Sequence, residues 1–129
     1  MEKFSTALLA ILLTLLLYGS VFADETQDSG NPISTMATIM LHLNHYPGEE
    51  EKMQLNDIIS HSKSVEITTI ASALLNMRHS VNGEDKEKLQ NIMRDNSTSD
   101  QARTLAGVLL EINHHPNSSQ KETLSALIH

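Results

Sequence analysis

Histidine is the residue type in this chain whose spacing points most directly to chemistry. Seven histidines are present, and three of them, His45, His79 and His114, recur at intervals of 34 to 35 residues. A neutral imidazole is the commonest side-chain ligand for transition metals, and a charged one interacts favourably with the carbonyls at a helix C-terminus. The recurrence therefore predicts either a metal-binding role or a helix-capping role for these three side chains.

Metal binding by the recurring histidines is expected to need local partners. Two nitrogens on one ion lie within about 4 Å of each other, whereas equivalent residues in stacked helical repeats are expected about 8–10 Å apart. His42 and His45, at i and i+3, offer two neighbouring imidazoles. Glu111, His114 and the adjacent His115 form a second set, similar to the Glu-x-x-His element of di-metal helical bundles. These sets predict weak binding of zinc, copper or nickel, with no single ion shared by all three repeats.

The helix-capping role is the one that the sequence favours. A histidine in the last turn of a helix donates to unpaired carbonyls and gains about 0.3–1 kcal/mol from the helix dipole when it is charged. On this interpretation the protein needs no cofactor, and metal binding is the alternative.

Catalytic motifs are absent from the chain. It has no cysteine, and therefore neither a thiol nucleophile nor a CxxCH haem motif. It also lacks a Gly-x-Ser-x-Gly elbow, an HExxH zinc motif and a glycine-rich phosphate loop. We therefore expect a protein that is not an enzyme.

Three lysines recur with the histidines, at Lys52, Lys86 and Lys121. Each is expected early in a helix, where a cation is mildly unfavourable, so its recurrence suggests an acidic partner or a binding role. Together with the three histidines they flank one turn in each repeat. We refer to these six positions as the turn edge, and we expect it to be an interaction surface.

The elements that position these residues come from a threefold internal repeat. Six positions carry the same residue in all three copies: Thr35/Thr69/Thr104, Ala37/Ala71/Ala106, Leu41/Leu75/Leu110, His45/His79/His114, Lys52/Lys86/Lys121 and Leu55/Leu89/Leu124. Apolar residues at helical spacing predict a broad buried stripe on the first helix of each copy and a narrow one on the second. Pro47-Gly48, Asn82-Gly83 and Pro116-Asn117 separate the two helices. The predicted fold is all-α, with three stacked helical hairpins forming a short α-solenoid or a compact six-helix array.

The last hairpin ends in apolar residues without a polar capping helix. Leu124, Leu127 and Ile128 are expected either to fold back into a compact bundle or to contact a second copy of the chain. They are therefore candidates for self-association.

The domain organisation is expected to be simple. Lys3, the apolar run 7–18 and the small residues before position 24 predict a cleavable signal peptide over residues 1–23. Residues 24–32 are acidic and rich in turn formers, which predicts a disordered leader. The helical domain then covers 33–129, with repeats at about 33–63, 64–98 and 99–129. We expect an exported protein, periplasmic or secreted, in which the sequons at Asn96 and Asn117 matter only in a eukaryotic secretory pathway.

Composition narrows the class of partner. The net charge is −7, which argues against nucleic acid and anionic membranes. Tyr46 is the only aromatic residue after position 23, so stacking sites for sugars or bases are not expected. The predicted function is an exported helical-repeat protein that binds a protein partner or forms a homo-oligomer. Metal binding or buffering is the alternative.

Overall fold

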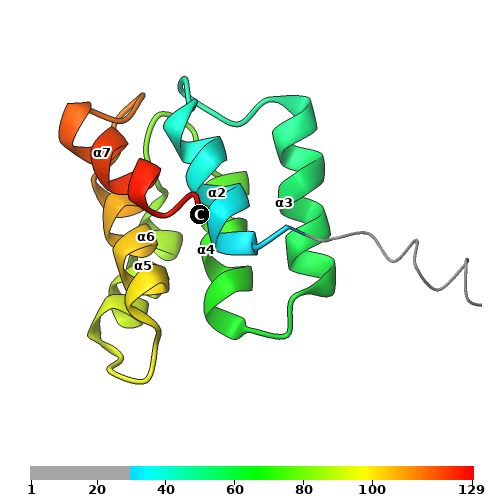
Figure 1. Ribbon diagram of the computed structural model, residues 1–129, viewed down its shortest axis with the longest axis vertical. Coiled ribbons are helices and arrows are strands. Elements are labelled where there is room, and N and C mark those ends of the chain that lie inside the picture. The colour runs from blue at the N-terminus through cyan, green and yellow to red at the C-terminus, as the bar shows by residue number, and fades with distance from the viewer. Residues whose placement is uncertain (1–29) are drawn as a thin grey trace, which may run out of the picture.

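Six helices make up most of residues 30–129, the part of the chain that the computed structural model describes (Figure 1). They are α2 (Pro32–Leu41), α3 (Glu49–His61), α4 (Val65–Leu75), α5 (Gly83–Arg94), α6 (Asp100–Glu111) and α7 (Ser118–Ala126). Each repeat supplies one hairpin, so the predicted all-α fold is confirmed. The predicted signal peptide lies outside the described residues.

Polar residues begin the helices. Ser64 accepts a hydrogen bond from the amide of Ile67, and Asn82 and Asn117 do the same for the amides three residues on. Such N-caps satisfy one of the unpaired amides at a helix start. Asn31 caps α2, which begins at Pro32, and residues 24–29 of the predicted leader lie outside the described residues.

The helices are arranged as a closed ring. The first helices of the hairpins, α2, α4 and α6, pack against one another in the centre. The second helices pack outside them, α3 against α4 and α5 against α6, and α7 returns to pack against α2. Figure 1 shows this return, with the C-terminal segment lying beside α2. Each hairpin therefore contacts both of the others, as in a compact six-helix array and unlike an open solenoid.

The core repeats the same positions three times. Each inner helix contributes two large residues and an alanine that are fully buried, and each outer helix contributes one buried leucine. These are Met36/Ile70/Leu105, Ala37/Ala71/Ala106, Met40/Leu74/Leu109 and Leu55/Leu89/Leu124. The alanines allow the inner helices to approach closely, and the single leucine anchors each outer helix.

Closure of the ring accounts for the apolar C-terminus. Leu124 is fully buried within its own chain, and Leu127 and Ile128 pack partly buried against the same core. Of the two arrangements considered for these residues, folding back is the one observed, so Leu124 is not available to a second copy of the chain.

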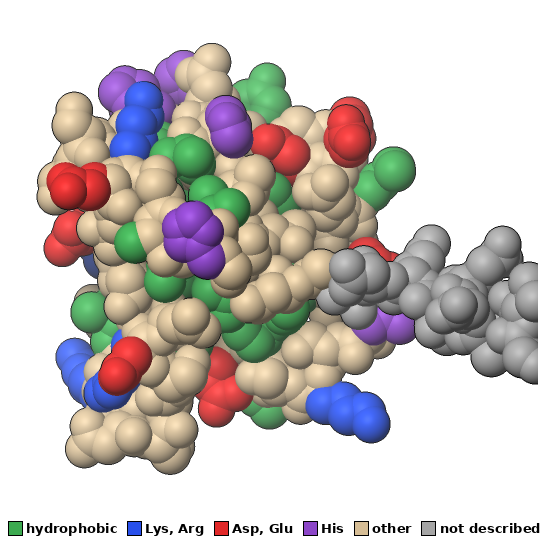
Figure 2. Space-filling view, in the orientation of Figure 1, with side chains coloured by type: hydrophobic (Ala, Val, Ile, Leu, Met, Phe, Trp, Pro, Cys, Tyr) green, Lys and Arg blue, Asp and Glu red, His purple; other side chains and the backbone are tan. Residues whose placement is uncertain are grey.

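The distribution of side chains over the surface gives little further indication of function. On the face in Figure 2, acidic and basic side chains are spread around the margin, and uncharged and hydrophobic atoms occupy the middle. Among residues 30–129, no helix combines the length and the apolar character needed to cross a membrane.

Candidate metal centre

Each recurring histidine lies at the centre of a tight turn that follows an inner helix. His45, His79 and His114 have φ values of 71°, 64° and 68°. In each turn the amide of the following residue donates to the carbonyl of the preceding one, at 2.9, 2.6 and 2.9 Å respectively. This is a γ-turn with a positive φ at its central residue, a rare and strained conformation for any residue other than glycine.

The backbones of the three turns are joined in a closed cycle. The amide of His45 donates to the carbonyl of His114 at 2.6 Å, that of His79 to His45 at 2.9 Å, and that of His114 to His79 at 2.6 Å. Each histidine thus gives one hydrogen bond and receives one. The cycle defines an approximate threefold axis and satisfies backbone groups that the turns would otherwise leave unpaired.

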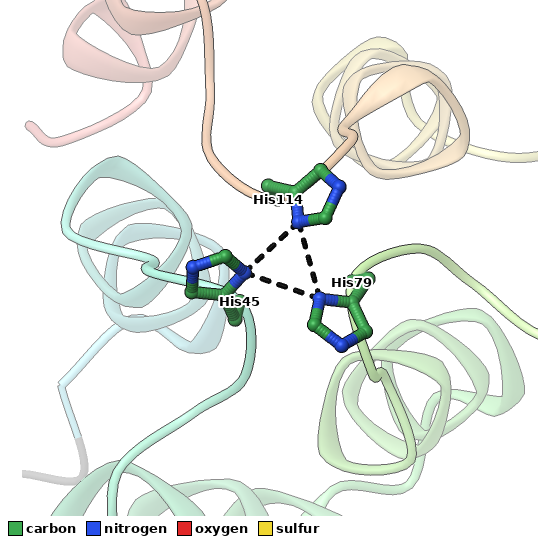
Figure 3. A group of neighbouring side chains, drawn as sticks. All are labelled: His45, His79 and His114. Atoms are coloured by element: carbon green, nitrogen blue, oxygen red, sulfur yellow. Dashed lines mark hydrogen bonds between the residues drawn. The ribbon is translucent and has the colours of Figure 1, made fainter.

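The side chains converge on the same axis. In Figure 3 each ring points its Nδ1 towards the other two. The Nδ1 atoms are 3.1 Å apart between His45 and His79, 2.9 Å between His45 and His114, and 3.1 Å between His79 and His114. The ring centroids are further apart, at 4.8 to 5.1 Å. The group lies at the surface, with His45 partly buried and His79 exposed.

The three imidazoles cannot satisfy one another by hydrogen bonding alone. A ring nitrogen of a neutral histidine is either a donor or an acceptor. Among three such nitrogens at least two must be of the same kind. At least one of the three contacts therefore places two lone pairs, or two N–H groups, about 3 Å apart, which is unfavourable. A cation on the axis removes the conflict, because all three Nδ1 atoms then present lone pairs to it.

The distances suit a transition-metal ion. With metal–nitrogen bonds of about 2.1 Å, a tetrahedral ion holds its nitrogens about 3.4 Å apart, and an octahedral ion holds three facial nitrogens about 3.0 Å apart. The observed 2.9–3.1 Å is closer to the facial arrangement. In either geometry the three Nδ1 atoms would hold the ion and leave further coordination positions open for water or another ligand.

Backbone strain gives an independent reason to assign a role to the side chains. If the turns required only a positive φ, glycine would adopt it without steric cost, whereas other residues incur about 1–2 kcal/mol. The chain has five glycines, and none of the described ones has a positive φ. Histidine occupies all three strained positions instead, which indicates that the imidazole itself is required.

The electrostatics around His114 favour its uncharged form. Loss of hydration lowers the pKa of His114 below its ordinary value of 6.5, and the nearby His79, His45 and His115 lower it further. A neutral imidazole is the form that binds a metal ion.

The expectation that the equivalent histidines are held about 8–10 Å apart is wrong, since their Nδ1 atoms lie 2.9–3.1 Å from one another. It assumed that the repeats stack in a line, so that equivalent residues are separated by a helix-packing distance. In a closed ring, residues at the same repeat position lie close to one another if they are near the axis, whatever the distance between the helices that precede them. The identity of the histidine in all three copies was the available signal for this.

The recurring histidines also do not lie in the last turn of the helices, where the predicted capping role places them. The inner helices end three or four residues before these histidines, at Leu41, Leu75 and Glu111. Among residues 30–129, no other group of three or more His, Asp or Glu brings its ligand atoms within 4.8 Å, so Glu111, His114 and His115 do not form one.

The remaining predicted ligands have other neighbours. His42 directs its Nδ1 at the carbonyl of Thr38, 2.9 Å away, so this residue makes the helix-end contact expected of His45. His115 directs its Nδ1 at the carbonyl of Pro116, 3.4 Å away.

The lysines of the turn edge do not join the histidines. Lys52 has the acidic partner that its position predicts, since its Nζ lies 2.8 Å from Glu49. Lys86 and Lys121 make no ion pair with any residue in 30–129. The turn edge thus separates into a histidine cluster on the axis and lysines in the outer helices.

Comparison with known proteins adds no assignment, since no protein-family model, no curated protein and no solved structure matches this chain.

Proposed function

We propose that this protein binds a divalent transition-metal ion through Nδ1 of His45, His79 and His114. The observation that carries the proposal is the mutual 2.9–3.1 Å approach of three Nδ1 atoms that cannot all be paired by hydrogen bonds. Imidazole ligands suit nickel, copper and zinc, and the −7 net charge of the chain favours the approach of a cation.

The proposed role is binding or buffering of the metal rather than catalysis. No Asp or Glu among the described residues lies in the ligand group, so no carboxylate there is placed to act as a general base on a metal-bound water. With the signal peptide expected over residues 1–23, we propose that the protein works after export. The interaction role expected from the sequence loses one support, because Leu124 is buried within its own chain.

Calorimetric titration of the protein with nickel, copper and zinc tests the proposal. We expect one ion per chain, and a loss of affinity of at least about 100-fold in His79→Ala, beyond the effect usual for an outer-shell partner. His42→Ala is the matched control and should bind as the wild type does.

Two outcomes would overturn the assignment. One is affinity weaker than about 0.1 mM for all three metals. The other is affinity that survives His79→Ala but is lost in His42→Ala, which would restore the local pair of His42 and His45.

A further inference from the structure

A cavity of about 530 Å³ adjoins the histidine cluster between repeats 1 and 2. Repeat 1 lines it with Tyr46 and Lys52, and repeat 2 lines it with Asn76, Arg78 and His79 among others. His79 thus belongs both to the wall of this cavity and to the histidine cluster. A molecule in the cavity would lie beside the proposed metal ion.

The wall of the cavity is suited to an anion of single charge. Arg78 makes no ion pair with any residue in 30–129, and a guanidinium pairs best with a planar carboxylate. The second cation, Lys52, already has Glu49 at 2.8 Å. In the metal-free protein this single uncompensated charge fits a monocarboxylate better than a phosphate, which carries nearly two negative charges.

The cavity breaks the threefold symmetry of the ring. The positions equivalent to Arg78 are Asn44 and Asn113, so only the turn of repeat 2 carries a cation beside its histidine. Asparagine, which the other two repeats carry at this position, is therefore a natural control substitution for Arg78.

The second nitrogen of His79 supplies a further donor. Within the described residues, only Nδ1 of this ring has hydrogen-bonding neighbours, namely the Nδ1 atoms of His45 and His114. A neutral imidazole that ligates a metal through Nδ1 carries its proton on Nε2. Metal-bound histidines usually donate that N–H to a carboxylate, carbonyl or water, which orients the ring and strengthens it as a ligand.

We propose that this cavity binds a small monocarboxylate, which pairs with Arg78 and accepts the Nε2–H of His79 while Nδ1 holds the metal. The inference rests on the proposed metal-binding function. It makes the two ligands cooperative, because the metal fixes the proton on Nε2 and the carboxylate strengthens His79 as a metal ligand. By linkage, each tightens the other by the same factor, which we expect to be about 10-fold.

Amide NMR spectra of the zinc-loaded and metal-free protein test the proposal, with sodium acetate and sodium benzoate as probes at constant ionic strength. We expect saturable shifts at Asn76 and Arg78, with affinity about 10-fold tighter in the zinc-loaded form. Arg78→Asn places the residue of the other two repeats in an equivalent turn, so it should fold and bind zinc while losing most of its carboxylate affinity. Lys121→Ala removes a charge in the third repeat and should change nothing.

Failure of this inference is distinguishable from failure of the metal site. If nickel, copper and zinc all fail to bind, the proposed function fails first. If zinc binds but neither carboxylate gives saturable shifts, the carboxylate site alone is overturned. The same conclusion follows if Arg78→Asn and Lys121→Ala weaken carboxylate binding equally, or if inorganic phosphate binds as tightly as acetate.

Discussion

The amide of His79 donates to the carbonyl of His45 at 2.9 Å, and the Nδ1 atoms of the same two residues lie 3.1 Å apart. The two backbones and the two side chains of this pair therefore both come into contact across the boundary between two repeats. The backbone bond fixes where the strained turns sit, and the turns fix where the imidazoles meet. The backbone conformation and the metal-binding side chain of these residues have different roles, which different substitutions can change separately.

Substitution at position 79 is expected to separate the two roles. His79 has a φ of 64°, which glycine adopts freely and alanine does not. In the metal-free protein we expect His79→Gly to be as stable as the wild type or more stable by up to about 1 kcal/mol. We expect His79→Ala, which keeps the strained φ, to be less stable than His79→Gly by about 1 kcal/mol. Denaturant unfolding in the presence of a chelator measures both.

Neither substitution should retain the metal site. If His79→Gly were much less stable than the metal-free wild type, the ring contacts of His79 would outweigh its backbone strain. The argument that the imidazole is kept for its chemistry would then fail.

The stability of the metal-free protein should rise with pH near neutrality. The pKa of His114 is lowered below 6.5, by loss of hydration first and then by its histidine neighbours. As the pH falls through about 6.5, the unfolded chain takes up a proton at this residue before the folded protein does, so stability falls. Thermal unfolding between pH 5 and 8 should show this slope, and His114→Asn should reduce it.

Metal binding should weaken over the same pH range, because each proton displaces a ligand lone pair. Titration of zinc at pH 7.5 and pH 5.5 provides the measurement. A metal affinity independent of pH would be inconsistent with imidazole ligands.

The buried leucines of the outer helices should be equivalent. Leu55, Leu89 and Leu124 are all fully buried, and removal of a buried leucine side chain costs about 2–5 kcal/mol. We expect Leu124→Ala to lower the free energy of unfolding by about as much as Leu55→Ala and Leu89→Ala. Chemical denaturation, with light scattering before and after, gives both stability and oligomeric state. A Leu124→Ala variant that unfolds like the wild type but changes its oligomeric state would contradict the closed ring.

Thr98 provides a test of the connection before α6. Its hydroxyl is buried without a hydrogen-bond partner, while the neighbouring Ser99 caps the helix by accepting from Ala102. A buried unpaired hydroxyl costs about 1–3 kcal/mol, so Thr98→Val should stabilise the protein by about 1 kcal/mol or more. Thr38→Val, which removes an exposed hydroxyl that donates to Ser34, is the control and should have little effect on thermal unfolding.

The sequence predicted the helices better than the way in which they assemble. The apolar spacing around Met36 and Met40, and the single leucine of each outer helix, correctly predicted inner and outer layers. The cap of α6 is Ser99, which directly follows Thr98, and adjacent hydroxyl residues are interchangeable as sequence signals.

The histidine cluster was missed for a geometric reason. Three copies of a hairpin can stack in a line or close into a ring, and the apolar pattern of a single hairpin is compatible with both. The distance between His45 and His114 depends on that choice, which is made by the packing of α7 against α2. The apolar pattern along a single helix carries no information on whether the hairpins stack in a line or close into a ring.

Closure of the ring has a consequence for the minimal unit of this architecture. Each hairpin contributes one imidazole, one amide and one carbonyl to the axis, and no hairpin contributes a part that the others lack. A chain containing a single hairpin could in principle rebuild the same centre as a homotrimer with true threefold symmetry. The present chain is then equivalent to such a trimer fused end to end, and a fused chain can carry Arg78 in one turn where the other two carry asparagine.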